Sequence, residues 1–407
     1  MSITKKQKLS HRTNWDPLGI PEEIHSLIFQ HLNGNDVKTA SEISWHWYNV
    51  VGESRECMKK IILRLKEPGN CEIETLQNSP RNYQFLTLIG PINNENLKIL
   101  DLYSSSLKNV QLINEDTNED QEAFIPISLP LLENLKINYI SKDILKFFTT
   151  SSKKLKVIAF EKVDKGTRDD LISFLNAFAS SLVRLELKNK ALDLIFEQEI
   201  VEVLKINLNA LYLFQSNRTD SGGTVIVNYH RPTRLRTQIN RHVNNFLLSQ
   251  AESLKSLSLD GFWYSGTIHV AFKELPHLTE VSICRCVDHE RLKIDDYPNA
   301  NIKTINFLKF LRCKRQTVWS DHKYLEICNI LKEAPHLKHL HLYEIPKGTI
   351  EYAANYFHNL IDLSYNVKGS NTSVCPNNQQ RDINYIYRRL RSQRPNLFKL
   401  FQNNRQI

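Results

Sequence analysis

Residues 182–188, LVRLELK, contain the pattern that decides the fold of this chain. Leucine occupies the first, fourth and sixth positions of this heptapeptide, with variable residues between. Side chains of a β-strand point alternately to its two faces, so Leu185 and Leu187 share one face and the charged residues around them share the other. The heptapeptide therefore predicts a short strand with an apolar core face and a polar outer face.

The same apolar spacing repeats from about residue 96 onward. Its clearest copies are Leu97, Leu100, Leu102; Leu182, Leu185, Leu187; Leu208, Leu211, Leu213; Leu254, Leu257, Leu259; and Leu337, Leu340, Leu342. Weaker copies are Leu132, Leu135, Ile137; Leu155, Ile158, Phe160; Leu278, Val281, Ile283; Ile302, Ile305, Phe307; and Leu360, Leu363, Tyr365. Helix-like stretches at 144–148, 171–175 and 324–331 precede some copies, so each unit is expected to be a helix, a tight turn and a strand. One unit cannot cover its own leucines, and stacked units align their strands in a parallel sheet.

These units resemble the leucine-rich repeat family in apolar spacing and in their length of roughly 23 to 35 residues. The resemblance implies an α/β fold, a horseshoe-shaped solenoid with parallel strands on its concave face. The family usually has Asn or Cys three residues past the third apolar position, and only Cys286 follows that rule, so an irregular horseshoe is expected. The interval between Leu208 and Leu254 is about two repeats wide. It contains either a degenerate unit or, as we favour, a projecting insertion at 217–245, whose role the sequence leaves open.

The N-terminal segment at 18–51, LGIPEEIHSLIFQHLNGNDVKTASEISWHWYNVV, predicts three short helices. Pro21 is suited to the first helical turn, Gly34 to a left-handed stop, and Asp36 to the N-cap of the second helix. Apolar residues recur at helical spacing in the first helix, and Phe29 lies well off that stripe. The stripe consists of Ile24, Leu27, Ile28 and Leu32. A helix that is apolar on two sides, in a segment of about 40 residues, needs a further surface to cover it.

The order of residues in this segment resembles the F-box family. The matching residues are Ile20-Pro21-Glu22, Ile28-Phe29, His31-Leu32, Asp36-Val37, Ser41, Ile43-Ser44 and Trp47. The resemblance covers about a tenth of the chain and implies a three-helix module that binds a Skp-type adaptor, which in turn joins a cullin and a RING subunit. The adaptor-binding residues it implies are Ile20, Pro21, Ile24, Ile28, Phe29, Leu32, Val37 and Trp47. The alternative is an ordinary helical hairpin packed on the following domain.

The expected organisation is a disordered basic tail (1–14), an F-box (15–60), a linker and N-terminal cap (61–95), leucine-rich repeats (96–368), and a loop with a basic C-terminal cap (369–407). No run of apolar residues approaches a membrane span or a signal peptide, so a cytoplasmic or nuclear location is expected, with no membrane partner. The seven cysteines include no CxxC pair, and reduced thiols are expected.

Catalytic and cofactor motifs are missing from the sequence. It contains no GxxxxGK, HExxH or GxSxG and no paired-cysteine zinc framework, so we expect a non-enzymatic protein without metal or cofactor. The net charge of +9 arises partly from arginines at 231–241 and 381–394. They are not interleaved with aromatic residues in a recognised module, so nucleic acid is an unlikely partner.

Outward positions of the predicted strands form the candidate target-binding face. They are Arg184, Glu186, Lys188, Tyr212, Phe214, Asp260, Glu280, His339, His341 and Tyr343. Aromatic side chains beside charges are typical of protein-binding hot spots. The sequence therefore predicts the substrate-recognition subunit of an SCF-type (Skp-cullin-F-box) ubiquitin ligase, acting in ubiquitin-dependent protein degradation. The alternatives are an F-box scaffold outside any ligase and a solenoid that binds nucleic acid or another acidic surface. The identity of the target, any need for phosphorylation and the actual recruitment of a cullin are left open.

Overall fold

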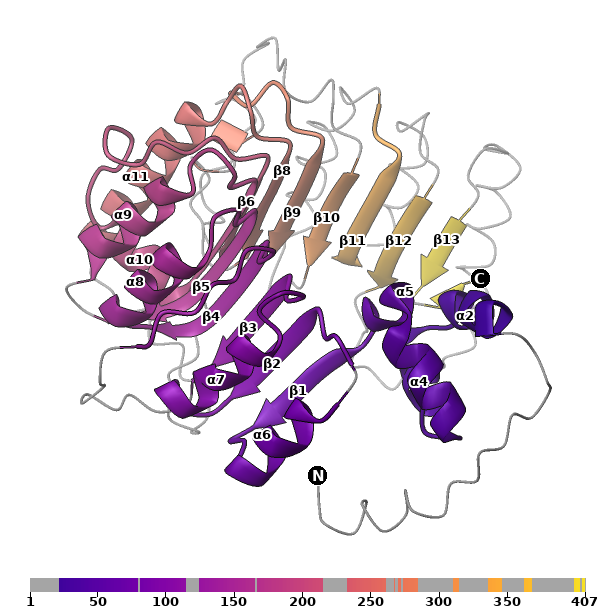
Figure 1. The fold of residues 1–407 in the computed structure, drawn as a ribbon. Coiled ribbons are helices and arrows are strands. Elements are labelled where there is room, and N and C mark those ends of the chain that lie inside the picture. Colours follow the sequence, from indigo (N-terminus) through magenta and orange to yellow (C-terminus); the bar gives the residue numbers. More distant parts are fainter. Residues whose placement is uncertain are drawn as a thin grey trace, which may run out of the picture. The chain divides into compact units, whose positions relative to one another are not determined.

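The chain forms an α/β structure in which helices accompany a parallel sheet (Figure 1). The computed structural model describes residues 22–79, 81–114, 124–164, 167–214, 233–260, 267, 270–271, 274–284, 310–314, 336–345, 362–367, 399–402 and 405–406. Contacts within the chain define two compact units, Met1–Leu182 and Val183–Ile407.

The first unit begins with four short helices. They are α2 (Glu22–His31), α3 (Gly34–Ala40), α4 (Trp45–Glu53) and α5 (Arg55–Met58). Side-chain oxygens cap three of them: Asn33 accepts hydrogen bonds from the backbone of Asn35 and Asp36, while Ser44 caps α4 and Ser54 caps α5.

The predicted boundary between the first two helices is wrong in detail. Asn33, rather than Asp36, is the N-cap of α3, and Gly34 is the first residue of α3 rather than a left-handed stop. Gly34 is nevertheless required by geometry, because a Cβ there would lie 2.5 Å from the carbonyl oxygen of Lys60. Lys60 in turn donates from Nζ to the carbonyl oxygen of Leu32 at 2.7 Å, and so occupies an acceptor near the end of α2.

The sheet of the first unit consists of parallel strands that pair in chain order. They are β1 (Ile62–Lys66), β2 (Phe85–Ile89), β3 (Asn109–Ile113), β4 (Asn134–Ile140) and β5 (Val157–Val163). The helices between them are α6 (Asn70–Gln77), α7 (Asn94–Leu102) and α8 (Lys142–Ser151), and α9 (Arg168–Ala177) follows β5. The pairing aligns Leu63, Leu86, Val110, Leu135 and Ile158 in one column.

The second unit repeats this parallel arrangement. Its strands are β6 (Arg184–Lys188), β7 (Ala210–Phe214), β8 (Ser256–Asp260), β9 (Glu280–Cys284), β10 (Phe310–Lys314), β11 (His339–Ile345), β12 (Asp362–Val367) and β13 (Lys399–Gln402). A last strand, β14 (Arg405–Gln406), is antiparallel to β13. Its described helices of more than a few residues are α10 (Asn189–Phe196) and α11 (Thr233–Ser249).

Apolar side chains fill the space between strands and helices. In the first unit, Phe148 on α8 and Phe174 on α9 are fully buried, as is Phe160 on β5. Figure 1 shows α8 and α9 on the same side of β4 and β5. Burial of each such side chain contributes about 1.5–3 kcal/mol to the stability of the fold. The packing of α8 and α9 against β4 and β5 is therefore stabilised by these rings.

Most predicted strand positions are confirmed, and the misses have a physical cause. The copies that begin at residues 132, 155, 182, 208, 254, 278, 337 and 360 all coincide with strands. The copy at Leu97 is wrong, because these leucines belong to α7, where a spacing of three also places side chains on one buried face. The copy at 302–307 lies outside the described residues, and the neighbouring strand is β10, with Leu311 beside Leu340.

Three strands of the first unit were not predicted, although two of them contain the same apolar spacing. In β3 the spacing consists of Leu107, just before the strand, and Val110 and Leu112 within it. In β2 it consists of Tyr83, just before the strand, and Leu86 and Leu88 within it. The strand β1 has only Leu63 and Leu65, and its Ile62 side chain is exposed. Between Leu208 and Leu254, the interval about two repeats wide, the helix α11 precedes β8. Strand β7 pairs directly with β8, so no further strand lies between β7 and β8 in the sheet. Residues 215–232 of that interval lie outside the described residues.

Candidate protein-binding surfaces

The inner side of the N-terminal helices is aromatic. Phe29 is only 2% exposed, and its ring lies edge-on to Trp47 with centroids 5.3 Å apart. His25, one helical turn before Phe29, is also buried and packs edge-on against the same Trp47. Its Nδ1 lies 3.3 Å from Nε2 of His46. These rings, together with the buried Val37, join α2, α3 and α4 around one small core.

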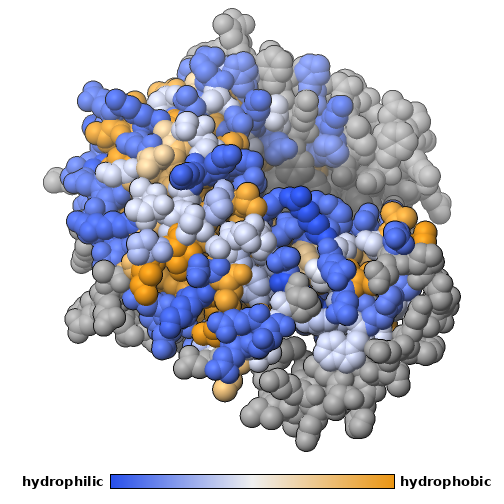
Figure 2. All heavy atoms as spheres, viewed as in Figure 1, coloured by the Kyte–Doolittle hydropathy of each residue, from blue (hydrophilic) through white to orange (hydrophobic). Residues whose placement is uncertain are grey.

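The opposite side of α2 is apolar and exposed. Leu27, Ile28 and Ile24 are 52%, 46% and 44% exposed. Residues three and four apart lie side by side on a helix, so these three side chains form one surface, named here the α2 apolar row. At the junction of α3 and α4, Ile43 and Trp45 are also exposed, at 50% and 38%. Figure 2 shows hydrophobic residues at the surface over α2.

The predicted adaptor-binding residues do not all lie on one side of the first helix. Two of them, Ile24 and Ile28, are exposed, whereas Phe29, which was also predicted to face the adaptor, is buried in the interior. The remaining predicted adaptor-binding residues are placed as follows: Val37 is buried, Leu32 and Trp47 are half-buried, and Ile20 and Pro21 lie outside the described residues. Leu27 was not in the predicted set, although its helical spacing from Ile24 and Ile28 signals the shared face.

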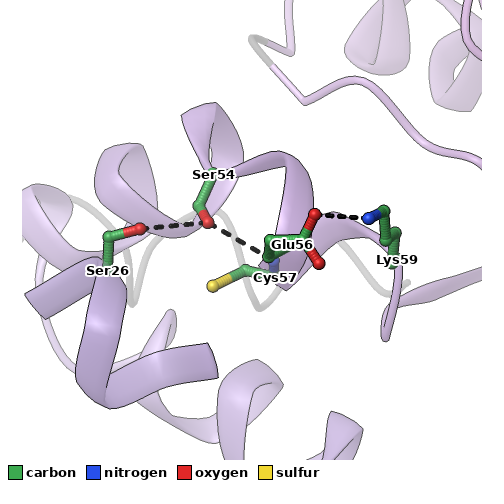
Figure 3. A network of polar contacts seen from close by, with 5 residues as sticks. All are labelled: Ser26, Ser54, Glu56, Cys57 and Lys59. Carbon is green, nitrogen blue, oxygen red and sulfur yellow. Dashed lines mark hydrogen bonds and ion pairs between the residues drawn. The ribbon is translucent and has the colours of Figure 1, made fainter. Parts of the chain in front are cut away.

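A polar network fixes α2 against α5 (Figure 3). Ser26 Oγ donates to Ser54 Oγ at 3.2 Å, and Ser54 Oγ accepts the backbone N–H of Cys57 at 3.3 Å. Burial raises the pKa of the Cys57 thiol above its ordinary value. On the exposed side of α5, a hydrogen bond from Lys59 lowers the pKa of Glu56. Of these bonds, Ser26–Ser54 joins α2 to the N-cap of α5, and the others lie within α5 and its caps.

A second candidate surface lies on the outward positions of β6 and β7. The pairing places Glu186 beside Tyr212 and Lys188 beside Phe214. Arg184 forms an ion pair with Glu186, with Nη2 and Oε1 2.6 Å apart, and its guanidinium lies 4.0 Å from the centre of the Tyr212 ring. The ammonium of Lys188 lies 6.0 Å from the centre of the Phe214 ring. These five predicted residues are thus brought together.

The surface continues across β8 and β9. Asp260 lies beside Phe214, and Ser258 lies beside Tyr212. On the next strand, Glu280 accepts a hydrogen bond from Ser256 Oγ at 3.2 Å. We name this surface the β6–β9 face; it comprises Arg184, Glu186, Lys188, Tyr212, Phe214, Ser256, Ser258, Asp260 and Glu280. The serines were absent from the predicted set, although their alternation with Leu257 and Leu259 places them on the same side.

The remaining predicted target-binding residues lie further along the sheet. The half-buried His339 is on β11, in register with Asp362 on β12. His341 and Tyr343 are on the same strand, and their side chains lie outside the described residues. Strand β10 separates this group from Glu280 on β9, so the predicted residues form two groups rather than one.

A polar pocket of about 280 Å³ lies in the first unit, between the N-terminal helices and the turns that precede β2 and β3. Arg55 and Glu53 line it from the helices, and Gln84, Ser106 and Lys108 line it from the sheet side. Its walls include two cations, one acid and four neutral polar side chains, so no single ligand charge is favoured.

Metal ligands do not cluster among the described residues: no group of three or more His, Cys, Asp or Glu side chains is placed to hold an ion. Nor is any helix in the described part of the chain both long and apolar enough to cross a bilayer. In comparisons with known proteins, no family model matches the sequence, and no curated protein matches it significantly.

Proposed function

We propose that this chain is the substrate-recognition subunit of an SCF-type ubiquitin ligase. In this proposal the N-terminal helices are an F-box that binds a Skp-type adaptor, and the strands belong to a leucine-rich-repeat solenoid that binds a target protein. The observation that carries the proposal is the α2 apolar row, whose three large side chains are each more than two-fifths exposed.

The α2 apolar row favours a partner because the other side of the same helix is already satisfied. His25 and Phe29 fill the interior, so α2 needs none of Ile24, Leu27 or Ile28 to hold the small core together. Burying each of these against another protein would contribute about 1.5–3 kcal/mol. An amphipathic helix that lays such a row into an apolar groove is a recurrent mode of recognition.

The regular strand register supports the second half of the proposal. Successive strands within each unit place apolar residues beside apolar residues, as in Leu185, Leu211 and Leu257. Each strand then presents its alternate residues together on the other face, which is how stacked repeats build an extended binding surface. On this proposal the chain has no catalytic residues of its own, and it acts in the cytoplasm or nucleus by holding the target lysine near a charged conjugating enzyme.

Coexpression with a Skp-type adaptor tests the proposal directly. The full chain should copurify with the adaptor, and the double variant Leu27→Asp/Ile28→Asp should lose it, because two carboxylates would enter the apolar contact. Leu248→Asp is the matched control, since Leu248 is 44% exposed on α11 in the other unit, and it should retain the adaptor. Circular dichroism should give all three proteins the same helix content.

Two results of this experiment would contradict the proposal, one for the F-box assignment and one for membership of a ligase. Equal adaptor recovery with the double variant and the wild type would remove the F-box assignment. Adaptor binding without any recovery of cullin and RING subunits would favour the F-box scaffold outside a ligase.

A further inference from the structure

We infer that the β6–β9 face binds an extended peptide segment whose outward side chains run acidic, apolar, basic at alternate positions. This inference rests on the proposed function, which assigns the strand faces to the target, and adds the chemistry of what is bound. Three features of the face lead to it: a cation on β6, two rings on β7, and acids on β8 and β9.

The cation available to a ligand is Lys188. Arg184 is already neutralised by Glu186 at 2.6 Å, and the Glu186 side chain is only 10% exposed. Among the described residues, no carboxylate forms an ion pair with Lys188. An acidic side chain of the ligand would therefore find its partner at Lys188, at the β6 end of the face.

The centre of the face is a pair of half-buried rings. Tyr212 is held in place by the Arg184 guanidinium 4.0 Å from its ring centre, a cation–π contact that restricts the ring before any ligand arrives. Phe214 lies two residues further along the same strand, on the same side. Rings fixed in this way favour an apolar ligand side chain, because little conformational freedom is lost when they are covered.

The β8 and β9 end of the face is acidic. Asp260 lies beside Phe214, and in the described part of the chain it has no ion-pair partner. Glu280 is exposed on β9, and Ser256 orients its carboxylate through a hydrogen bond at 3.2 Å. The register sets these two carboxylates apart: Asp260 is in line with Phe214 and Lys188, whereas Glu280 is in line with Ser256, four residues earlier along the strands. A basic ligand side chain at the Lys188 end of the strands would therefore meet Asp260.

The spacing of these strands is comparable with the rise of an extended peptide. Lys188, Phe214 and Asp260 are in register on three neighbouring strands about 4.8 Å apart, so Lys188 and Asp260 are separated by about 10 Å. An extended chain rises about 3.3 Å per residue, so its first and fifth residues are about 13 Å apart, and their long side chains, which lie on one side, can converge on groups about 10 Å apart. The third residue then falls near Phe214. Charge complementarity thus selects a five-residue core of the form acidic-x-apolar-x-basic, in either chain direction.

Peptide display tests the inference with the full chain, coexpressed with the adaptor and purified through a tag on the full chain itself. A phage library with five randomised positions should give wild-type selections enriched in acidic-x-apolar-x-basic cores, read in either direction. With Lys188→Glu, the same selection should lose the acidic position and gain a basic one, so that basic-x-apolar-x-basic cores predominate. The matched control Lys190→Glu, at an exposed position of α10 two residues away, should select the same cores as the wild type.

A quantitative arm uses synthetic Gly-flanked peptides with the cores Glu-Ala-Leu-Ala-Arg, Arg-Ala-Leu-Ala-Arg and Glu-Ala-Ser-Ala-Arg. We expect wild type to prefer the first over each of the others by roughly ten-fold, and Lys188→Glu to prefer the second. Selections without enrichment, or the same cores from wild type and Lys188→Glu, would overturn the inference. Adaptor recovery is measured in the same preparations, so loss of the F-box assignment is seen separately from loss of peptide selection.

Discussion

Phe29 and Trp47 meet edge-to-face in the N-terminal helices, with ring centroids 5.3 Å apart and ring planes at 74°. The contact joins α2 to α4, and the buried His25 packs against the same indole. Position 29 is therefore a determinant of folding, whereas position 27, two residues earlier on the same helix, is a determinant of the surface. The two positions predict opposite results in a stability experiment.

Phe29→Ala should destabilise the N-terminal helices by about 3–5 kcal/mol, because it leaves a cavity beside Trp47. Leu27→Ala should change stability by at most about 0.5 kcal/mol, since its side chain is exposed. Hydrogen exchange of residues 22–58 in the full chain measures both. Equal protection in the two variants would contradict the interior position of Phe29.

Gly34→Ala should destabilise the same helices by more than about 2 kcal/mol, because a Cβ would lie 2.5 Å from the carbonyl oxygen of Lys60 and the backbone would have to shift. Gly69→Ala is the matched control. A Cβ at Gly69 meets no atom within 4 Å, so its effect should stay below about 1 kcal/mol. Chemical denaturation of the two variants provides the comparison, and a tolerated alanine at position 34 would show that the close approach is absent.

Cys57 should react with iodoacetamide far more slowly than Cys71 in the folded protein. Cys57 is buried, and burial raises its pKa, so at pH 8 it has less of the reactive thiolate than an ordinary thiol. Cys71 is exposed. Mass spectrometry of the two peptides after timed alkylation gives both rates, and full denaturation should make them similar. Fast labelling of Cys57 without denaturation would contradict its burial.

Arg184→Met should destabilise the second unit by about 1–3 kcal/mol, because it leaves the nearly buried carboxylate of Glu186 without its cation. The double variant Arg184→Met/Glu186→Leu should recover most of that loss, since no buried charge is left unpaired. A double-mutant cycle in urea measures the coupling.

The exposed pair Lys156 and Glu133, 2.9 Å apart, supplies the comparison for that cycle. Its coupling should be at most about 1 kcal/mol because both side chains are well solvated. Similar coupling energies for the two pairs would mean that the burial of Glu186 does not strengthen its interaction with Arg184.

Strand positions could be read from the sequence at four of the five copies in which leucines fill all the pattern positions. Residues 182–188 and 254–259 are such cases, because burial of one face demands apolar residues at every second position. The pattern failed at Leu97, since a helix can bury residues spaced by three equally well. It also missed β2, in which Tyr83 replaces the first leucine.

The sides of the first helix could not be assigned from the sequence. Ile24, Leu27 and Ile28 form a better apolar stripe than His25 and Phe29, so spacing alone favours the wrong interior. The deciding factor is the aromatic contact of both inner residues with Trp47, which depends on where α4 lies. The grouping of Arg184 with Tyr212, in contrast, followed from strand alternation and from the pairing of consecutive strands.

The column of inward leucines has a consequence for how this protein can change. Leu185, Leu211 and Leu257 lie in register, and the residues next to them on each strand point the opposite way. A substitution at an outward position such as Lys188 or Asp260 leaves every inward neighbour in place, whereas a one-residue deletion within β7 would turn its outward aromatic side chains into the core. Ligand preference can therefore drift one residue at a time, while the length of each strand must stay constant.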